Sequence, residues 1–198
     1  MKRQYVLMRI MPLAIAGLMA AGCGSSKQMT QPTSVFGSNL RQMPCAEFDS
    51  DEYFTATGNS NGSQYRMDII QTAALTNAQN IVRQKMKHVY KGMIQDYSLS
   101  IGTNSGTDAD SKMERAGDQI IDAIVNDTRA TCGPLFSDPD DKGVVQCFVG
   151  IRVNKKQVVD AVSNYISNDE ELRIRFNEKN FREQMEKKFK EYKEEQTK

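Results

Sequence analysis

Hydrophobic and polar residues follow two different spacings along this chain, and each spacing predicts a type of secondary structure. Residues 53–57 are rich in strand-forming side chains and lead into a Gly/Asn/Ser run at 58–62, which predicts a first strand and a turn. Between residues 70 and 93, apolar side chains recur every three or four positions, interrupted at Lys85, which predicts a long helix. Residues 144–153 alternate in side-chain character and form the clearest strand of the sequence.

The remaining segments continue this succession of helices and strands. Gly, Ser, Thr, Asn and Asp dominate residues 97–111, which predicts a loop with an exposed tip at 104–110. Helical spacing resumes over 112–125, a strand is expected over 127–135, and turn-forming residues fill 137–143. Asn154 is a suitable N-cap for a valine-rich helix that follows it.

The C-terminal segment combines many charges with an apolar line at helical spacing, formed by Phe181, Met185, Phe189 and Tyr192. Such a line predicts a helix that packs on its own domain, and the alternative is a helix that binds a partner. Together the elements predict an α+β fold, in which a small antiparallel sheet is covered by one layer of helices, with a C-terminal amphipathic helix.

The first 22 residues have the pattern of a secretory signal peptide. Basic residues precede an apolar run at 10–22, whose 13 residues fall short of the roughly 20 that span a bilayer. The run ends in Ala20-Ala21-Gly22-Cys23, which resembles the lipobox of bacterial lipoproteins, although Ala20 stands where that motif usually has Leu. We expect cleavage before Cys23 and lipid attachment to it; the alternative is an ordinary secretory signal with an incidental cysteine.

A lipid on Cys23 would explain the segment that follows it. Residues 24–34 are polar, Gly/Ser-rich and without periodicity, which indicates a flexible tether. Two or more acyl chains anchor a protein stably, since each buried methylene contributes about 0.8 kcal/mol. No Asp follows Cys23, a feature of outer-membrane lipoproteins in enteric bacteria, so we expect an outer-membrane location in the bacterial cell envelope.

The predicted domain organisation has four parts. A signal peptide at 1–22 is removed, a lipidated N-terminus and tether occupy 23–44, an α+β domain covers 45–168, and a charged helix forms 169–198. Loss of Lys2, Arg3 and Arg9 with the signal peptide reduces 26 basic residues to 23, against 25 acidic ones. Nucleic-acid binding needs a concentrated basic surface, so this balance argues against such a partner.

Three further cysteines would face an environment in which disulfides persist. Cys132 and Cys147 lie on either side of the predicted turn at 137–143, so we expect them to pair across the strands of a hairpin. A Cys45–Cys132 bond is the next alternative, and three buried free thiols are a third.

No group of residues indicates catalysis. His88, the single histidine, has lysines at positions 87 and 91 but no adjacent carboxylate or nucleophile. Asp49, Asp51 and Glu52 form a weak calcium candidate, which we interpret as the solvated start of a strand. The cysteines lack metal-ligand spacing. We therefore expect a protein that is not an enzyme and that holds no metal or cofactor.

The order of the elements supports a comparison with a known family. A strand at 53–57 precedes a Gly turn and a long alanine-containing helix. A strand at 147–153 leads through Asn154-Lys155-Lys156 into a valine-rich helix, and Phe181-Arg182-Glu183-Gln184-Met185 follows. Together with Cys23, this order resembles the LPP-twenty family of small bacterial outer-membrane lipoproteins over residues 53–166. The resemblance implies an α+β domain at the outer membrane without catalytic residues. Related domains occur in proteins of the flagellar outer-membrane ring, but no motif in this chain supports that link.

Two classes of function follow. The leading one is a lipid-anchored envelope protein with a non-enzymatic structural or adaptor role, held in the membrane through Cys23 and docked to another envelope protein. The alternative is a periplasmic or surface binding module for a small ligand or glycan, which would use the loop at 102–111 and the nearby Tyr97.

Overall fold

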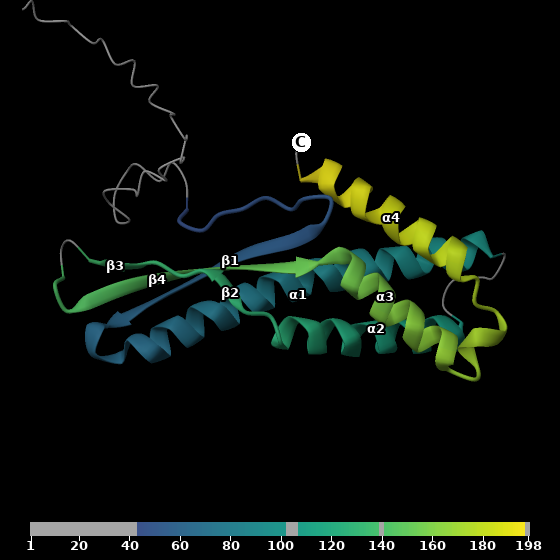
Figure 1. Ribbon diagram of the computed structural model, residues 1–198, viewed down its shortest axis with the longest axis horizontal. Helices are drawn as coiled ribbons and strands as arrows, with labels where there is room; N and C mark the ends of the chain where they lie inside the picture. The colour runs from purple at the N-terminus through teal and green to yellow at the C-terminus, as the bar shows by residue number, and fades with distance from the viewer. Residues whose placement is uncertain (1–42, 102–106, 139–140, 197–198) are drawn as a thin grey trace, which may run out of the picture. The chain divides into compact units, whose positions relative to one another are not determined.

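The computed structural model describes residues 43–101, 107–138 and 141–196. The predicted α+β class is confirmed, because an open antiparallel sheet packs with helices and a C-terminal helix is present (Figure 1). The predicted signal peptide, Cys23 and nearly all of the predicted tether lie outside the described residues. The elements are β1 (Tyr53–Ser63), α1 (Met67–Ser100), α2 (Asp108–Asn126), β2 (Ala130–Cys132), β3 (Leu135–Ser137), β4 (Val144–Asn154), α3 (Lys155–Asn168) and α4 (Glu178–Glu195).

Strand β4 is the centre of the sheet. β1 pairs with β4 along its whole length, from Tyr53 opposite Asn154 to Ser63 opposite Val144. On the other side of β4, β2 and β3 follow one another, so the single strand predicted over 127–135 is wrong. The break falls at Gly133-Pro134, because proline has no N–H to donate to a strand ladder.

The turn predicted at residues 58–62 is also wrong, since β1 runs straight through it. Gly58 lies against the backbone of α1, where a Cβ atom would overlap the Ala74 carbonyl oxygen and the Ala78 nitrogen. A Cβ on Gly62 would lie 3.3 Å from the Ile70 side chain. These glycines therefore serve close packing of a strand on a helix and not a reversal of the chain.

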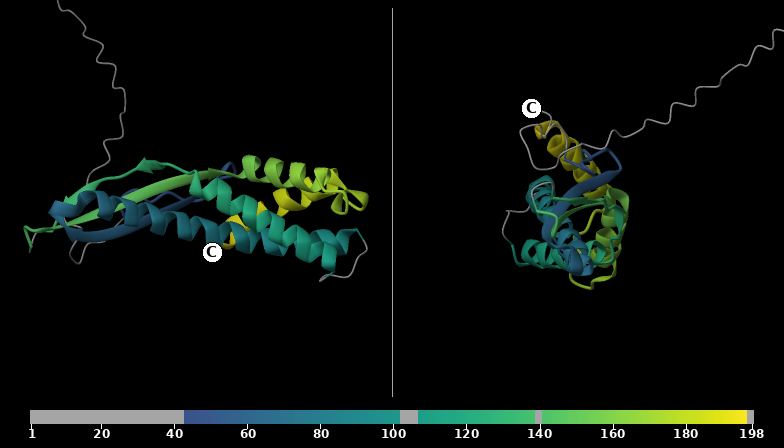
Figure 2. Two further views of the ribbon diagram at one scale, coloured as in Figure 1. Left: turned by 90° about the horizontal axis from the view of Figure 1, so that it is seen from below. Right: turned by 90° about the vertical axis from the view of Figure 1, so that its left-hand side faces the viewer.

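Helix α1 is the longest element, with 34 residues that span roughly 51 Å. Its first half covers one face of the sheet, and the other helices gather around its second half (Figures 1 and 2). The helix continues past the predicted loop start at 97 because Tyr97 is buried, and its hydroxyl accepts a hydrogen bond from the Asn177 N–H at 2.8 Å.

Helix α2 begins earlier than predicted because its first turn is capped. The Thr107 hydroxyl accepts from the Asp110 N–H, and the Asp110 carboxylate accepts from the Thr107 N–H. This capping box supplies partners for amide groups that the first helical turn leaves unpaired. Asp110 is buried, so the exposed loop tip predicted at 104–110 is wrong at that residue; residues 102–106 are not among those described.

Helices α3 and α4 follow the sequence pattern more closely. Asn154 caps α3 as predicted, with its side chain accepting from the Gln157 N–H at 3.0 Å. In α4 the side chains of Phe181, Met185 and Phe189 are buried, which confirms that the apolar line packs on its own domain. Within the part of the chain that the structure describes, no helix is long and apolar enough to cross a membrane.

Candidate functional site

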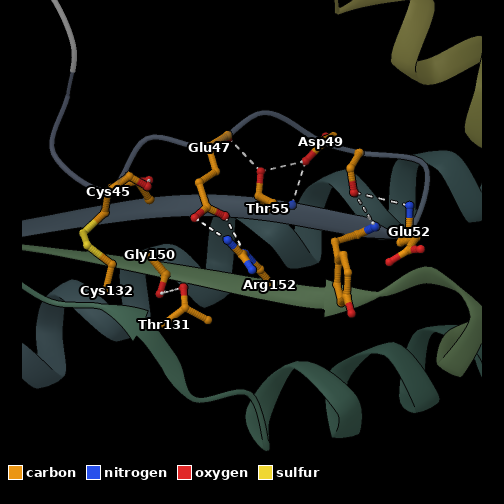
Figure 3. Close-up of polar contacts among 12 residues, drawn as sticks. Cys45, Glu47, Asp49, Glu52, Thr55, Thr131, Cys132, Gly150 and Arg152 are labelled. Carbon is orange, nitrogen blue, oxygen red and sulfur yellow. Dashed lines mark hydrogen bonds and ion pairs between the residues drawn. A yellow bond between two sulfur atoms is a disulfide. The ribbon is translucent and has the colours of Figure 1, made fainter. Parts of the chain in front are cut away.

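The segment 45–52, which we call the N-terminal strap, crosses the face of the sheet opposite α1 (Figure 3). Two strap carbonyls accept hydrogen bonds from β1 hydroxyls: Thr57 donates to Cys45 and Thr55 donates to Glu47, each at 2.8 Å. The strap is the first described segment after the predicted tether. Its attachment therefore determines how the domain would be joined to anything that holds its N-terminus.

A disulfide fixes the beginning of the strap. Cys45 is bonded to Cys132 of β2, with 5.8 Å between their Cα atoms and 87 residues between them in the sequence. Gly150 of β4 makes room for this bond, because a Cβ there would lie 3.1 Å from the Cys45 Cβ. A disulfide that closes so long a loop typically contributes about 2–4 kcal/mol to stability.

The predicted Cys132–Cys147 pair is therefore wrong, and the alternative Cys45–Cys132 bond is the one present. The hairpin is not symmetric about its turn, because β3 intervenes and aligns Leu135, and not Cys132, with Cys147. Cys132 aligns with Gly150 instead. Cys147 is a free, fully buried thiol in the hydrophobic core, and burial raises its pKa.

Three acidic side chains attach the strap to four different elements. Glu47 accepts two hydrogen bonds from the Arg152 guanidinium of β4, at 2.6 and 2.7 Å, and the hydrogen bond from Arg152 lowers the pKa of the carboxyl. Asp49 accepts from the Thr55 N–H at 2.6 Å and forms an ion pair with Lys85 of α1 at 3.3 Å. Asp51 pairs with Lys193 of α4 at 2.8 Å.

The interpretation of this acidic group as the solvated start of a strand is wrong for Asp49, whereas Asp51 and Glu52 are exposed. The Asp49 side chain is only 4% exposed, so its contacts are shielded from water. The Asp51 side chain is 81% exposed, and its ion pair is therefore open to solvent. Asp49 and Asp51 bind different cations and do not converge on one point. Among the described residues, no group of three His, Cys, Asp or Glu side chains is placed to hold a metal ion.

Lys155 holds the end of the strap at the junction of β4 and α3. Its ammonium donates to the Ser50 carbonyl at 2.7 Å, and its main-chain N–H donates to the Glu52 carbonyl at 2.9 Å. The side chain is almost fully buried and its ammonium lies 4.7 Å from the centre of the Phe54 ring. Burial lowers the pKa of this lysine, while the aromatic ring and the carbonyl offset part of the desolvation cost.

Two surface hollows lie beside α4. The larger, of about 350 Å³, lies between α3 and α4 and includes Lys156 and Arg182 in its lining, but both cations are paired with Asp160 at 2.6 Å. The other, of about 250 Å³, includes the exposed His88, and its lining contains no Ser, Thr or Cys that could act as a nucleophile. His88 is therefore a surface residue.

A small hollow of about 40 Å³ is lined by Tyr97 together with Thr107 and Asp110, but Tyr97 itself is buried and not exposed as the predicted binding surface required. Tyr97 is 1% exposed, and its ring lies edge-on to Phe181 with 5.6 Å between the ring centres. Burial raises the pKa of its hydroxyl, which also holds the start of α4 through Asn177. Tyr97 is thus a core residue and does not contact solvent in the way a ligand-binding tyrosine would.

Comparison with known proteins adds no family to this description: no protein-family model matches the chain, and no curated protein matches it. The resemblance to the LPP-twenty lipoproteins therefore stays a prediction.

Sequence reasoning missed the strap, although three signals pointed to it. Lys85 interrupts an otherwise apolar helix stripe, and it does so where Asp49 needs a partner. Gly150 lies inside a strand, where glycine often marks the close approach of another backbone. Lys155 stands in the first turn of a helix, where a cation opposes the helix dipole unless another contact compensates.

Proposed function

We propose that the protein is a lipid-anchored cell-envelope protein with a non-enzymatic structural or adaptor role at the outer membrane. The observation that carries this proposal is the attachment of the N-terminal strap. A disulfide, two partly buried hydrogen bonds and three ion pairs join these eight residues to β1, β2, β4, α1, α3 and α4. A pull on the N-terminus would reach every layer of the domain through short, direct contacts.

Such an attachment suits a domain held by its N-terminus. Without the disulfide, a force on the tether would peel the strap from the sheet one contact at a time, because exposed ion pairs contribute only about 0–1 kcal/mol each. With Cys45 bonded to Cys132, the force passes covalently to the strand beside β4. If Cys23 carries a lipid, the polar tether would join that anchor to the strap, and the attachment would hold the domain to the membrane.

An adaptor role also fits the polar contacts of the described part of the chain. The buried polar groups at the strap are paired with one another, and the lining of the hollow at His88 contains no Ser, Thr or Cys. The alternative, a ligand-binding module on the loop at 102–111, has less support because Tyr97 is buried. Thermal-shift screening with envelope glycans would favour that alternative if a glycan raised the melting temperature.

The direct test is to express the full chain in a bacterial host, separate inner and outer membranes, and compare the intact mass of the wild type with that of Cys23→Ser. We expect a mass increase equal to the attached lipid, recovery in the outer-membrane fraction, and loss of both in Cys23→Ser. Crosslinking in intact cells should then recover a protein neighbour with the wild type but not with the variant. A mature, unmodified chain in the soluble fraction would contradict the proposal.

A further inference from the structure

Strand β1 has one edge that pairs with β4 and a second edge that faces away from it. The register with β4 is unbroken from residue 53 to residue 63. Along such a strand, the N–H and C=O of alternate residues point to opposite edges. Tyr53 and Thr55 bond to the strap through their backbone groups, so the odd-numbered residues of β1 present theirs at the second edge.

The first half of this second edge is closed by the strap and α1. The Ser50 N–H donates to the Tyr53 carbonyl at 3.0 Å, and the Tyr53 N–H donates to the Ser50 hydroxyl at 3.0 Å. Asp49 accepts from the Thr55 N–H at 2.6 Å, and Lys85 donates to the Thr55 carbonyl at 2.9 Å. Charged groups and a crossing chain are common means of protecting a sheet edge from unwanted pairing.

The second half of the edge is open. The N–H groups of Thr57, Asn59 and Asn61 and the carbonyls of Thr57 and Asn61 have no hydrogen-bond partner among the described residues. The Asn59 carbonyl accepts from the Asn77 side chain at 2.8 Å and keeps a second lone pair. Residues 57–63 contain no proline and no charged side chain, so the usual blocks to strand addition are missing there.

An apolar line on α1 runs beside this open edge. Asn77 and Lys85 both reach outward carbonyls of β1, so the helix positions four residues apart from 69 to 85 lie along it. Ile69 and Ile81, which belong to this line, are 49% and 40% exposed, and Ala73 lies between them. Open backbone groups beside an apolar line are the arrangement to which an added strand binds.

We propose that this edge pairs with β1 of a second copy of the chain, antiparallel and about a two-fold axis at Asn59. Thr57 of each copy would then lie opposite Asn61 of the other. The unpaired N–H and carbonyl groups of the two strands would form about six hydrogen bonds with one another. The pairing would end where residue 63 of one copy lies opposite Thr55 of the other. The backbone groups of Thr55 are already bonded to Asp49 and Lys85 and cannot pair with a further strand.

Three features favour a second copy over an unrelated strand. The open backbone groups are arranged symmetrically about Asn59, as an isologous interface requires. The open stretch is uncharged, so a two-fold axis brings no like charges together. Asn77 is level with Asn59 on α1, and the same axis therefore places Ala73 of one helix opposite Ile81 of the other, a small side chain facing a large one.

Site-specific crosslinking tests the register directly. In the full chain carrying Cys23→Ser, Asn59→Cys would place two thiols about 5.5 Å apart at Cβ across the axis. The matched control, Asn61→Cys, would place them roughly 13 Å apart along the strands. We expect mild oxidation to give a covalent dimer with Asn59→Cys but not with Asn61→Cys. Equal crosslinking of both variants, or none in either, would overturn the proposal.

The mass in solution supplies an independent test. We expect the Cys23→Ser chain to sediment as a dimer at about 100 µM protomer, since dimer stability depends on concentration. Asn59→Pro removes an outward N–H without touching the β4 ladder and should give a folded monomer, whereas Asn59→Ser should stay dimeric. If the proline variant unfolds, Ile81→Glu serves in its place, with the exposed Ile174→Glu as control. A Cys23→Ser chain that stays monomeric would contradict the proposal, and so would a dimer that persists in these edge variants. Binding of this edge only to a different protein would also contradict it.

Discussion

At the scale of single residues, small side chains decide where the backbone of this protein can approach itself. Gly58 allows β1 to lie on the backbone of α1, and Gly150 leaves space for the disulfide between the strap and β2. Cys45 adopts a positive φ of 61°, a conformation that costs a non-glycine residue about 1–3 kcal/mol and persists only where surrounding contacts impose it. The disulfide and the Thr57 hydrogen bond supply those contacts.

Replacing Gly58 with alanine should strongly destabilise the protein. The added methyl group would overlap backbone atoms of Ala74 and Ala78, which cannot rotate away, so α1 would have to shift. We expect a loss of about 3 kcal/mol or more in the free energy of unfolding, measured by urea denaturation. Gly133→Ala is the matched control, because nothing lies within 4 Å of a Cβ there, and its effect should stay within about 0.5 kcal/mol.

The pair Glu47–Arg152 should make a small, pH-dependent contribution to stability. Arg152 lowers the pKa of the Glu47 carboxyl in the folded state, so the contribution is present above the unfolded pKa of about 4.5 and is lost as the pH falls through the folded pKa. Because the pair is partly exposed, Glu47→Gln should cost less than about 1 kcal/mol at pH 7.

Urea denaturation of wild type and Glu47→Gln at pH 7 and about pH 3 measures this dependence. The advantage of the wild type should shrink at the acidic pH, because the contribution of Glu47 is lost as the pH falls through its lowered folded pKa. Glu52→Gln removes a strap carboxylate without an ion pair in the described structure and should match the wild type at pH 7. An advantage of the wild type that is undiminished in acid would contradict the assignment.

At the scale of elements, the strap and α4 are linked through Lys155 and Phe54. The strap reaches Lys155, whose ammonium lies 4.7 and 5.2 Å from the ring centres of Phe54 and Phe189. Phe189 of α4 meets Phe54 edge-on at 5.4 Å. The first strand, the strap and the last helix therefore share one junction, although α4 lies far from the other two in the sequence.

Reduction should weaken the protein through the strap disulfide and not through Cys147. We expect a reductant to lower the free energy of unfolding of the wild type by about 2–4 kcal/mol. The double variant Cys45→Ser/Cys132→Ser should start from a similarly lowered stability and show no response to the reductant. Cys147→Ala is the control: it should lose stability through a core cavity and yet keep the full response. A double variant that still responds would show that another disulfide is present.

At the scale of the whole domain, one hydrophobic core joins the sheet to the helices along α1. Phe54 and Ile151 from the sheet, Met86 and Tyr97 from α1, and Phe181 from α4 all belong to this core and are at most 2% exposed. The C-terminal helix thus completes the domain, and its removal would expose Tyr97 in the second half of α1 and Phe54 in the sheet. For this reason we expect α4 to unfold together with the rest of the protein.

The role of α4 can be tested by shortening one of its core side chains. Phe181→Ala should cost about 3–5 kcal/mol, because the ring is fully buried between Tyr97 and Phe176. Ile174→Ala, at a residue that is 78% exposed, should change stability by less than about 0.5 kcal/mol. A Phe181→Ala protein that denatures like the wild type would mean that α4 is dispensable to the core.

The sequence alone determined those features that depend on neighbours within a few positions. The period of apolar residues predicted α1, α2, β4 and α3, and Asn154 was recognisable as a cap because its side chain bonds to an amide three residues on. The apolar line of α4 indicated a buried face. The signal for lipid attachment at Cys23 is also local, and it stays a prediction.

The tertiary structure alone decided which distant segments meet. Glycines in β1 suggested a turn by their local preference, yet packing on α1 outweighed that preference and kept the strand straight. The symmetric positions of Cys132 and Cys147 suggested a hairpin disulfide, yet the insertion of β3 shifted the alignment and left Cys132 to Cys45. The attachment of the strap also depends on contacts between distant segments, such as Glu47 with Arg152 and Cys45 with Cys132, and local spacing carries no information about such contacts.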